Sequence, residues 1–186
     1  MISPATIDDL FDLYELKGAA AYGELISQND HALQCAALAR ADGVNDALMV
    51  AALFHDVGHL VRDVQGNEDF DMGHDDDRHE ALGARILAPL FGPTVAQPVA
   101  LHVIAKRWLC TKEPQYHQRL SAESQATLIA QGGLLSDEEC ERFEAHPGFT
   151  DAIALRTWDD AGKIEGLHVG ELRGWEPIVR SLAAPR

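Results

Sequence analysis

The chain has 186 residues, and its 30 acidic and 15 basic side chains give a formal net charge of −15 at pH 7. This length fits one domain, residues 1–186, with a single hydrophobic core. The charge argues against partners that need a broad basic surface, such as nucleic acid or an anionic membrane. It is compatible with a small anion that two or three cations hold inside a pocket.

The N-terminus and the cysteines indicate the compartment. Met1 to Pro4 lacks the basic and apolar regions of a secretory signal, and no apolar run reaches the roughly 18 residues of a membrane span. Cys35, Cys110 and Cys140 are odd in number and widely spaced, which favours reduced thiols that serve as small apolar residues. We therefore expect a soluble, cytoplasmic protein, and no oligomeric state follows from the sequence.

Helical periodicity dominates the first third of the chain. Thr6 to Asp9 resembles a capping box, and apolar residues at helical spacing follow it until Gly18 ends the predicted helix. A loop of small residues comes next and carries one aromatic and one acidic side chain, Tyr22 and Glu24. A second helix is predicted from about Asn29 to Asp42, with a histidine in its first turn.

A third helix is predicted from Asn45 to Arg62, and most of it is apolar all round, as expected for the buried central helix of a domain. His55 and Asp56 stand side by side near its end. Burying an imidazole beside a carboxylate without partners costs several kcal/mol, so this pair indicates a bound cation. Three and four residues further on, His59 can share a face with them, and Gly58 permits close approach of another element.

The second half of the chain also reads as helices. An acidic loop, Asp63 to Asp77, comes first, and we interpret most of its charge as solvated. No alternating strand pattern or internal repeat occurs, so the predicted fold is an all-α bundle. The remaining predicted helices are 78–87, one that Pro98 opens and that continues to about 109, 122–131 capped by Ser121, one with a Ser136–Glu139 capping box, 149–160 and 176–182.

Four histidines and two aspartates fall near the starts or ends of these helices. Imidazole and carboxylate without thiolate suit iron, manganese or zinc, and helices of a bundle can direct such ligands to a common point. Six ligands exceed the need of one tetrahedral or facial site, so two metals bridged by Asp56 are the economical interpretation. The set is His31, His55, Asp56, His79, His102 and Asp159.

Several motifs, in one order along nearly the whole chain, carry a family resemblance. They are Gly23-Glu24, Gln28 with Asp30-His31-Ala32-Leu33-Gln34-Cys35, Leu53-Phe54-His55-Asp56-Val57-Gly58-His59, His79-Glu80, His102-Val103-Ile104-Ala105-Lys106-Arg107, Gln131-Gly132-Gly133 and Arg156-Thr157-Trp158-Asp159. The chain resembles the HD-domain superfamily, most of whose members are metal-dependent phosphohydrolases. It is more similar to its mixed-valence di-iron oxygenases, which use O2 to cleave the carbon–phosphorus bond of 1-hydroxyalkylphosphonates.

The resemblance implies a ligand set and a substrate-binding set. His31, His55, Asp56 and Asp159 would hold one iron, and Asp56, His79 and His102 the other, as an Fe(II)/Fe(III) pair with O2 as co-substrate and no catalytic residue beyond the cluster. His59, Lys106, Ser124 and Arg156 would grip the phosphonate. The spacing agrees independently, because Lys106 lies one turn after His102 and Arg156 one turn before Asp159.

The resemblance also implies a choice of substrates. The expected substrate is (R)-1-hydroxy-2-(trimethylammonio)ethylphosphonate, cleaved to glycine betaine and phosphate, and the alternative is 2-amino-1-hydroxyethylphosphonate, cleaved to glycine and phosphate. A quaternary ammonium prefers aromatic faces, which Tyr22 and Trp158 could offer, and negative charge, for which Glu24 is a candidate. The relatives carry a tyrosine three residues before this glutamate, where it can coordinate iron. Ala21 stands there in this chain, and Tyr22 lies one residue closer to Glu24.

Other functions stay open at this point. An HD-type phosphohydrolase would act on phosphate esters with a redox-inactive metal and without O2. A sensor that binds metal without turnover is disfavoured, because the ligand set is complete and has cations beside it. An inositol-type oxygenase would share the di-iron core but would not need the phosphonate grip of Lys106, Ser124 and Arg156.

Overall fold

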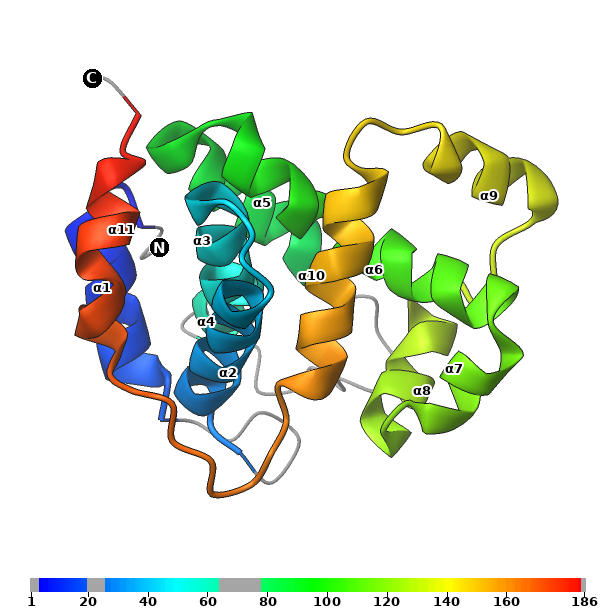
Figure 1. Cartoon of the computed structure of the whole chain (residues 1–186), viewed down its shortest axis with the longest axis horizontal. Coiled ribbons are helices and arrows are strands. Elements are labelled where there is room, and N and C mark those ends of the chain that lie inside the picture. Colours follow the sequence, from blue (N-terminus) through cyan, green and yellow to red (C-terminus); the bar gives the residue numbers. More distant parts are fainter. Residues whose placement is uncertain (1–3, 20–25, 64–77, 185–186) are drawn as a thin grey trace.

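The structure is a computed structural model that describes residues 4–19, 26–63 and 78–184, apart from the side chains of Arg62, Asp63 and Glu123. In these ranges the chain is helical and has no β-strand, which confirms the all-α prediction (Figure 1). The helices are α1 Ile7–Lys17, α2 Gln28–Ala41, α3 Asp46–Phe54, α4 Val57–Asp63, α5 His79–Phe91, α6 Pro93–Lys112, α7 Pro114–Arg119, α8 Ala122–Ala130, α9 Asp137–Glu144, α10 Phe149–Ala161, the short 3-10 helix η1 Leu172–Trp175 and α11 Glu176–Ser181.

Short polar side chains begin many of these helices. Thr6 accepts a hydrogen bond from the Asp9 amide while the Asp9 carboxylate accepts one from the Thr6 amide, so the predicted capping box is present. Ser136 and Glu139 form the second predicted box at α9. Each such cap satisfies amide groups that a helix start leaves without partners and contributes about 1 kcal/mol. The helix boundaries therefore follow local chemistry.

The central helix α3 is buried as predicted, and α2, α6 and α10 pack around it. Phe54, at its end, is fully buried and makes an edge contact with Phe11 of α1 and a stacked contact with Phe91 of α5. Full burial of such a side chain stabilises the fold by roughly 1.5–3 kcal/mol. The main core thus joins elements from both ends of the chain, since Trp175 and Val179 belong to it too.

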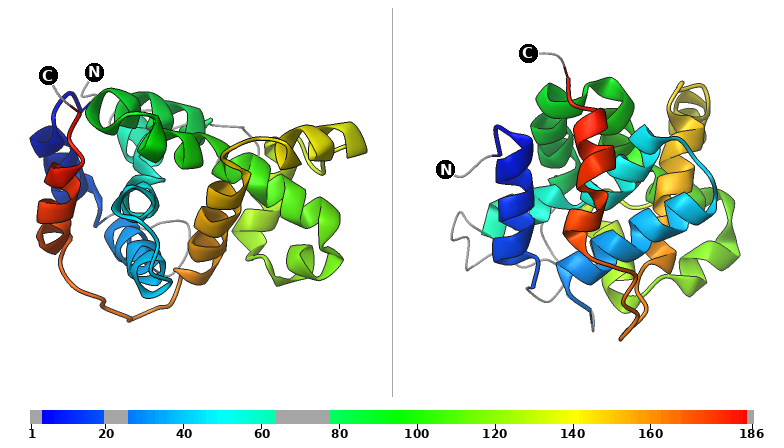
Figure 2. Two further views of the ribbon diagram at one scale, coloured as in Figure 1. Left: turned by 45° about the horizontal axis from the view of Figure 1, so that its top comes forward. Right: turned by 60° about the vertical axis from the view of Figure 1, so that its left-hand side comes forward.

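The bundle has two sides that meet at α6 and α10. In Figures 1 and 2, α1 and α11 flank α2 to α5 on one side, and α7, α8 and α9 lie on the other. Arg173 of η1 pairs with Glu15 of α1, and Arg180 of α11 pairs with Asp8 of α1. The far side has a smaller core around Leu109, Tyr116 and Leu128. The boundary between the two cores is where polar side chains are buried.

Three predictions about the helices were wrong. The third predicted helix is two helices, because the chain turns at His55 and Asp56 between α3 and α4. Pro98 lies inside α6, which starts at Pro93 instead, where the missing N–H costs nothing. Helix α7 was not predicted, since its six residues are too few to show a period.

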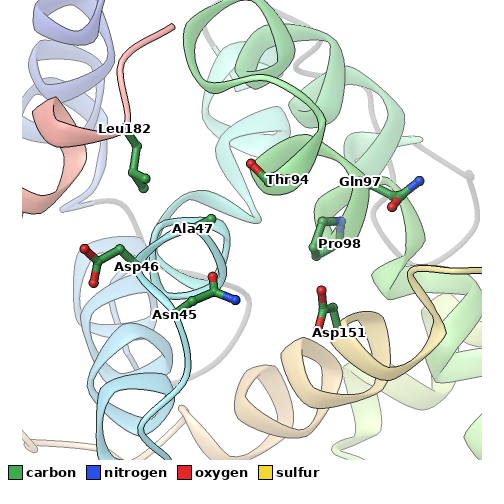
Figure 3. Close-up of a pocket in the computed structure, with 8 residues that line it drawn as sticks. All are labelled: Asn45, Asp46, Ala47, Thr94, Gln97, Pro98, Asp151 and Leu182. Carbon is green, nitrogen blue, oxygen red and sulfur yellow. The ribbon is translucent and has the colours of Figure 1, made fainter.

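The cysteines and the surface need little further description. All three cysteines are free and buried. In the described parts of the chain, no helix is long and apolar enough to cross a membrane. A surface pocket of about 660 Å³ lies where the start of α3 faces the first turns of α6 and of α10 (Figure 3). Two acidic residues, Asp46 and Asp151, are part of its lining. None of the predicted site residues lines it.

Candidate metal centre

Four helices and one turn bring the six predicted metal ligands together. His31 comes from α2, His79 is the first residue of α5, His102 lies in α6 and Asp159 in α10. The turn between α3 and α4 adds His55 and Asp56. All six side chains are buried, with at most 5% of any residue exposed. The turn that directly follows α3 therefore carries the pair that first indicated a site.

Main-chain carbonyl groups fix the orientation of three of the histidine rings. A carbonyl oxygen can only accept a hydrogen bond, so the ring nitrogen beside it, Nδ1, carries the proton in each case. The other nitrogen, Nε2, is then unprotonated in the neutral ring and turned towards the centre of the site, as metal-ligating histidines are commonly arranged. The three bonds join His31 to Gly162 (2.8 Å), His55 to Ala52 (2.9 Å) and His102 to Val99 (2.7 Å).

The inward nitrogen atoms form two pairs. Nε2 of His31 lies 3.3 Å from Nε2 of His55, and Nε2 of His79 lies 3.0 Å from Nε2 of His102. Two lone pairs at such a distance repel each other unless a proton or a metal ion lies between or beside them. Each pair therefore marks a position for a cation.

The Asp56 carboxylate lies between the two pairs. Its Oδ2 atom is 3.6 Å from His31 Nε2 and 3.5 Å from His55 Nε2, whereas its Oδ1 atom faces Nε2 of His79 at 3.7 Å and of His102 at 3.9 Å. These separations are long for hydrogen bonds. They approach the roughly 3–3.5 Å expected between two ligand atoms that each lie about 2.1 Å from one metal ion. One carboxylate can thus serve two metal positions.

Asp159 completes the first position, with Oδ1 3.4 Å from His31 Nε2 and Oδ2 3.9 Å from His55 Nε2. Among the described residues, Asp56 Oδ2 and Asp159 Oδ1 are buried without a hydrogen-bond partner. A buried carboxylate oxygen without a partner is costly. A metal ion would satisfy both atoms, so the residues present fit a pair of metal ions with nitrogen and oxygen ligands.

The charges of the cluster also fit metal binding. Burial raises the pKa of Asp56, but the neighbouring His55 and His59 outweigh it and hold that pKa far below its usual value. Burial, together with His79, lowers the pKa of His102 to about 3. The carboxylate is therefore ionised and His102 is neutral at neutral pH, which are the forms that bind metal. Burial lowers the pKa of His55, yet Asp56 raises it to about 9, so metal must displace a proton there.

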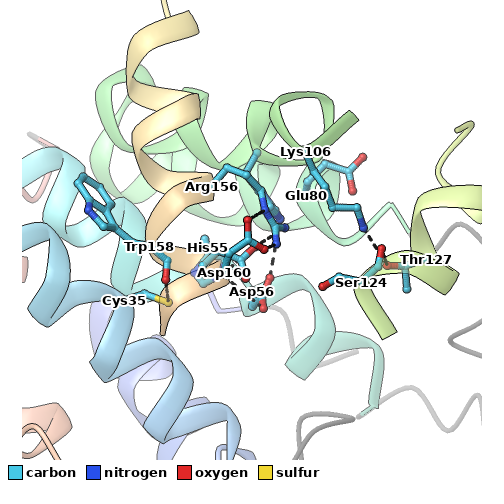
Figure 4. Close-up of polar contacts among 12 residues, drawn as sticks. Cys35, His55, Asp56, Glu80, Lys106, Ser124, Thr127, Arg156, Trp158 and Asp160 are labelled. Carbon is cyan, nitrogen blue, oxygen red and sulfur yellow. Dashed lines mark hydrogen bonds and ion pairs between the residues drawn. The ribbon is translucent and has the colours of Figure 1, made fainter. Parts of the chain in front are cut away.

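Two predicted phosphonate-binding cations lie at the edge of this cluster (Figure 4). Lys106 of α6 is only 2% exposed, and its Nζ donates to Thr127 Oγ1 of α8 at 2.8 Å. Arg156 of α10 is 4% exposed and places Nη1 2.6 Å from Asp159 Oδ2. A lysine and an arginine are rarely buried to this degree unless paired. The structure therefore places both predicted cations beside the cluster.

Other side chains hold Arg156. Its Nη2 group makes a close contact with Asp160 Oδ1, and its Nε donates to Asp160 Oδ2 and to the Tyr116 hydroxyl, both at 3.1 Å. Tyr116 in turn donates to Asp160. A guanidinium held through several donors has one orientation. The acid and the tyrosine thus position the arginine next to Asp159.

The remaining predicted substrate residues divide into three cases. Ser124 is buried in the first turn of α8, and Figure 4 shows it beside Thr127, the residue to which Lys106 donates. His59 is partly exposed, and its ring stacks on His79 with centroids 3.9 Å apart. Tyr22 and Glu24 lie outside the described residues, as does most of the acidic loop. The structure therefore brings the histidine and the serine to the site and leaves the ammonium end of the substrate as a prediction.

Trp158 does not have the orientation that a substrate-binding aromatic face would need, and this prediction was wrong. The residue is 4% exposed and belongs to the main core, and its indole N–H donates to Asp42 at 2.7 Å. Figure 4 shows it on the opposite side of α10 from Arg156. Neighbouring residues of a helix point about 100° apart, so Asp159 and Trp158 cannot face the same pocket.

Sequence reasoning missed several residues near the cluster. Cys35 lies 3.7 Å from His31 Nδ1 and donates its thiol proton to the Trp158 carbonyl, and burial, followed by Asp159 and Asp56, raises its pKa well above the usual value. It was interpreted only as a small apolar residue. The sequence offered a signal in each case, because each missed residue lies four positions after a predicted site residue. Cys35 follows His31, Asp160 follows Arg156, and Lys163 follows Asp159.

Comparisons with known proteins agree with this geometry. A model of the HD domain matches residues 29–131. The chain is 39% identical to a hydroxymethylphosphonate dioxygenase from Gimesia maris, over 94% of this chain and 87% of that protein. It is 34% identical to a glycine-betaine-forming [1-hydroxy-2-(trimethylamino)ethyl]phosphonate dioxygenase from Leisingera caerulea, over 91% of this chain and 86% of that one. The chain therefore belongs to the HD-domain family, in its branch of oxygenases that act on phosphonates.

Proposed function

We propose that this protein uses O2 to cleave the carbon–phosphorus bond of a small 1-hydroxyalkylphosphonate, with two iron ions held by the six clustered residues. The observation that carries the proposal is that one residue, Asp159, contacts both a proposed metal ligand and a proposed substrate-binding cation. Asp159 lies 3.4 Å from His31 on one side and 2.6 Å from the Arg156 guanidinium on the other. A phosphonate bound by the cations would therefore have its neighbouring carbon and hydroxyl next to the metals.

The proposed ligands follow the two nitrogen pairs. His31, His55 and Asp159 would hold one iron, His79 and His102 the other, and Asp56 would bridge them. When bound, the iron pair supplies the activation of O2 and the oxidation of the hydroxyl-bearing carbon. Its histidine and carboxylate shell matches the ligand types of non-haem iron sites. The charge of Asp159 is then shared with iron.

The protein's own groups bind and orient the substrate. Lys106 and Arg156 would offer charge-assisted hydrogen bonds to phosphonate oxygens, and the buried Ser124 hydroxyl would add a further donor. Tyr116 and Asp160 hold the arginine, so it loses little freedom when the anion binds. Because the ligands and both cations are buried, bulk water has little access to the reacting carbon.

Hydroxymethylphosphonate is the substrate that we propose first. The relative with the higher identity acts on it, and it has no ammonium group that would need an aromatic surface. Trp158, one of the two aromatic residues expected to receive a trimethylammonium group, lies in the core. Hydroxymethylphosphonate and O2 balance as formate and phosphate, with both oxygen atoms of O2 entering the products. The trimethylammonio substrate is the second candidate, because a 34% identical relative acts on it.

A parallel assay tests both the reaction and the substrate. Iron-loaded, partly reduced protein is given hydroxymethylphosphonate, the trimethylammonio and 2-amino hydroxyethylphosphonates, or an aryl phosphate ester, while O2 uptake and phosphate release are followed together. We expect equal amounts of O2 consumed and phosphate released, fastest with hydroxymethylphosphonate and accompanied by formate. Faster turnover of the trimethylammonio compound to glycine betaine would select the second substrate. Hydrolysis of the ester without O2, with the phosphonates untouched, would identify a phosphohydrolase.

A further inference from the structure

The three histidines that donate to main-chain carbonyl groups find their acceptors at very different distances along the chain. His55 and His102 each donate to a carbonyl group three residues earlier, so these two bonds are local to one helix and form when it forms. His31 differs, because its acceptor is the carbonyl of Gly162, 131 residues further along the chain. The orientation of the His31 ring therefore depends on where the segment after α10 lies.

Gln34 of α2 holds that segment in place. Its buried side chain accepts a hydrogen bond from the Ile164 amide at 2.9 Å and donates to the carbonyl groups of Ile164 and Leu167 at 2.8 and 3.0 Å. The segment is not helical there, so its main-chain groups need partners of this kind. Gln34 also lies one turn after His31 on the same helix, and both side chains can reach the segment from one face of α2.

The segment lies directly on α2 and next to two ligands of the first metal position. A Cβ atom at Gly162 would lie 2.6 Å from Cys35 Sγ and 3.1 Å from the Cys35 amide nitrogen, so only a glycine permits this approach. The carbonyl of the same residue bonds His31, and the next residue, Lys163, places its Nζ 3.7 Å from Asp159 Oδ1. A shift of the segment would therefore be felt at this position first.

We propose that Gln34 is a positioning residue for the first iron. It holds the Gly162 carbonyl in place, and this carbonyl keeps the proton of the neutral His31 ring on Nδ1, so that Nε2 is the atom that binds the metal. A neutral imidazole without such an acceptor also adopts the tautomer with its proton on Nε2, which cannot bind metal through that atom. This inference rests on the proposed function, since it concerns one of the two proposed iron positions.

Two variants test the proposal by different routes. Gln34→Met removes all three hydrogen bonds and keeps the length of the side chain, whereas Gly162→Ala leaves Gln34 intact and pushes the segment away from α2. Competition with a coloured chelator under anaerobic conditions measures the affinity for Fe(II) without any substrate. Each variant is measured in two backgrounds. His79→Ala leaves the first position with its full ligand set, and His31→Ala leaves the second.

The expected effect is confined to one position. In the His79→Ala background, we expect each variant to weaken Fe(II) binding roughly 10- to 100-fold, the range for groups that orient a metal ligand. In the His31→Ala background, the affinity should not change. Gln125→Met is the matched control, because it removes a glutamine hydrogen bond to a main-chain carbonyl, that of Leu120 at 3.0 Å, on α8. It should leave both positions as they are.

Melting temperatures of the same samples are compared with the iron affinities. Unchanged affinity at the first position, or equal weakening of both positions, would overturn the proposal and leave Gln34 with a general structural role. The proposed function fails differently. If Gln34→Met weakens the first position alone, yet the wild type consumes no O2 with any hydroxyphosphonate, the positioning role stands and the oxygenase reaction does not.

Discussion

The site has a metal half, formed by the six clustered histidines and aspartates, and an anion half, formed by Lys106, Arg156 and the side chains that hold them. The two halves are built from different kinds of interaction. In the metal half, main-chain carbonyl groups of Ala52, Val99 and Gly162 orient three histidine rings. In the anion half, side chains hold side chains, as when Asp160 holds Arg156 and Thr127 holds Lys106. The backbone of the fold therefore fixes the metal geometry, whereas single substitutions can change the anion pocket.

This difference predicts how substitutions in each half should act. A ligand ring held by a nearby helix carbonyl moves only if the helix moves, and the helices around it share the main core. A cation held by a neighbouring hydroxyl or carboxylate can change with one residue. Substitutions in the metal half should therefore remove all activity, and those in the anion half should give graded losses.

Replacing Asp56 by alanine should have the largest effect, because its two oxygen atoms face both nitrogen pairs. We expect iron content to fall from two ions per chain to near zero and O2 uptake to stop. Metal analysis of purified protein measures this directly. The control is Asp46→Ala, which removes an exposed acid from the first turn of α3. Retention of one full iron by Asp56→Ala would show that Asp56 does not bridge.

Gly58→Ala tests whether backbone packing sets the metal geometry. A Cβ atom at Gly58 would lie 2.1 Å from the carbonyl oxygen of His79, so α5 would have to move and take this ligand with it. We expect partial loss of the second iron and about 1–3 kcal/mol of destabilisation, read from metal content and from urea unfolding. Gly174→Ala, where a Cβ would meet nothing within 4 Å, is the control. Full iron content and wild-type stability in Gly58→Ala would contradict the idea that this contact holds α5.

Arg156→Met tests the anion half. We expect iron to remain, because His31, His55 and Asp56 still surround the first position, while phosphonate affinity falls roughly 10- to 100-fold. Asp160→Asn should give a smaller loss in the same direction, since it loosens the arginine without removing it. Steady-state KM and iron content distinguish the two halves. Iron loss in Arg156→Met would mean that this arginine serves the metal half by holding Asp159.

The sequence indicated which six side chains would cluster, and the reason is their chemistry. Burial of His55 and Asp56 after an apolar run indicates a bound cation, and capping residues such as Ser136 indicate where helices begin. Periodicity could not show the turn at His55, because its torsion angles remain helical and only the pattern of hydrogen bonds is broken. The clustering of the six side chains was thus predictable, whereas the turn that presents its central pair was not.

The anion half was predicted less completely because it depends on contacts between distant side chains. Lys106 and Arg156 could be placed by their spacing from His102 and Asp159. Lys163 follows Asp159 by four residues, but it lies beyond the end of α10. Its segment is held by Gln34, more than a hundred residues away, which the spacing alone does not reveal. Trp158 was placed wrongly for a related reason, since proximity in sequence to Asp159 does not give it the same direction.

The effect that is smallest at neutral pH is a change in pH dependence at Lys106. Its pKa of about 7 is far below the ordinary value of 10.5, mainly because of burial, and its protonated form is the one that attracts a phosphonate. As pH rises through 7 the free enzyme loses this charge, so kcat/KM should fall towards a tenfold loss per pH unit. Lys106→Arg should remove this decline, because a guanidinium stays charged throughout the range. Ionisation of the phosphonate affects both proteins equally, so the ratio of the two profiles isolates the lysine. A constant ratio of the two kcat/KM profiles between pH 6 and 9 would show that Lys106 binds substrate without titrating. The charge of the anion half would then be independent of pH in this range.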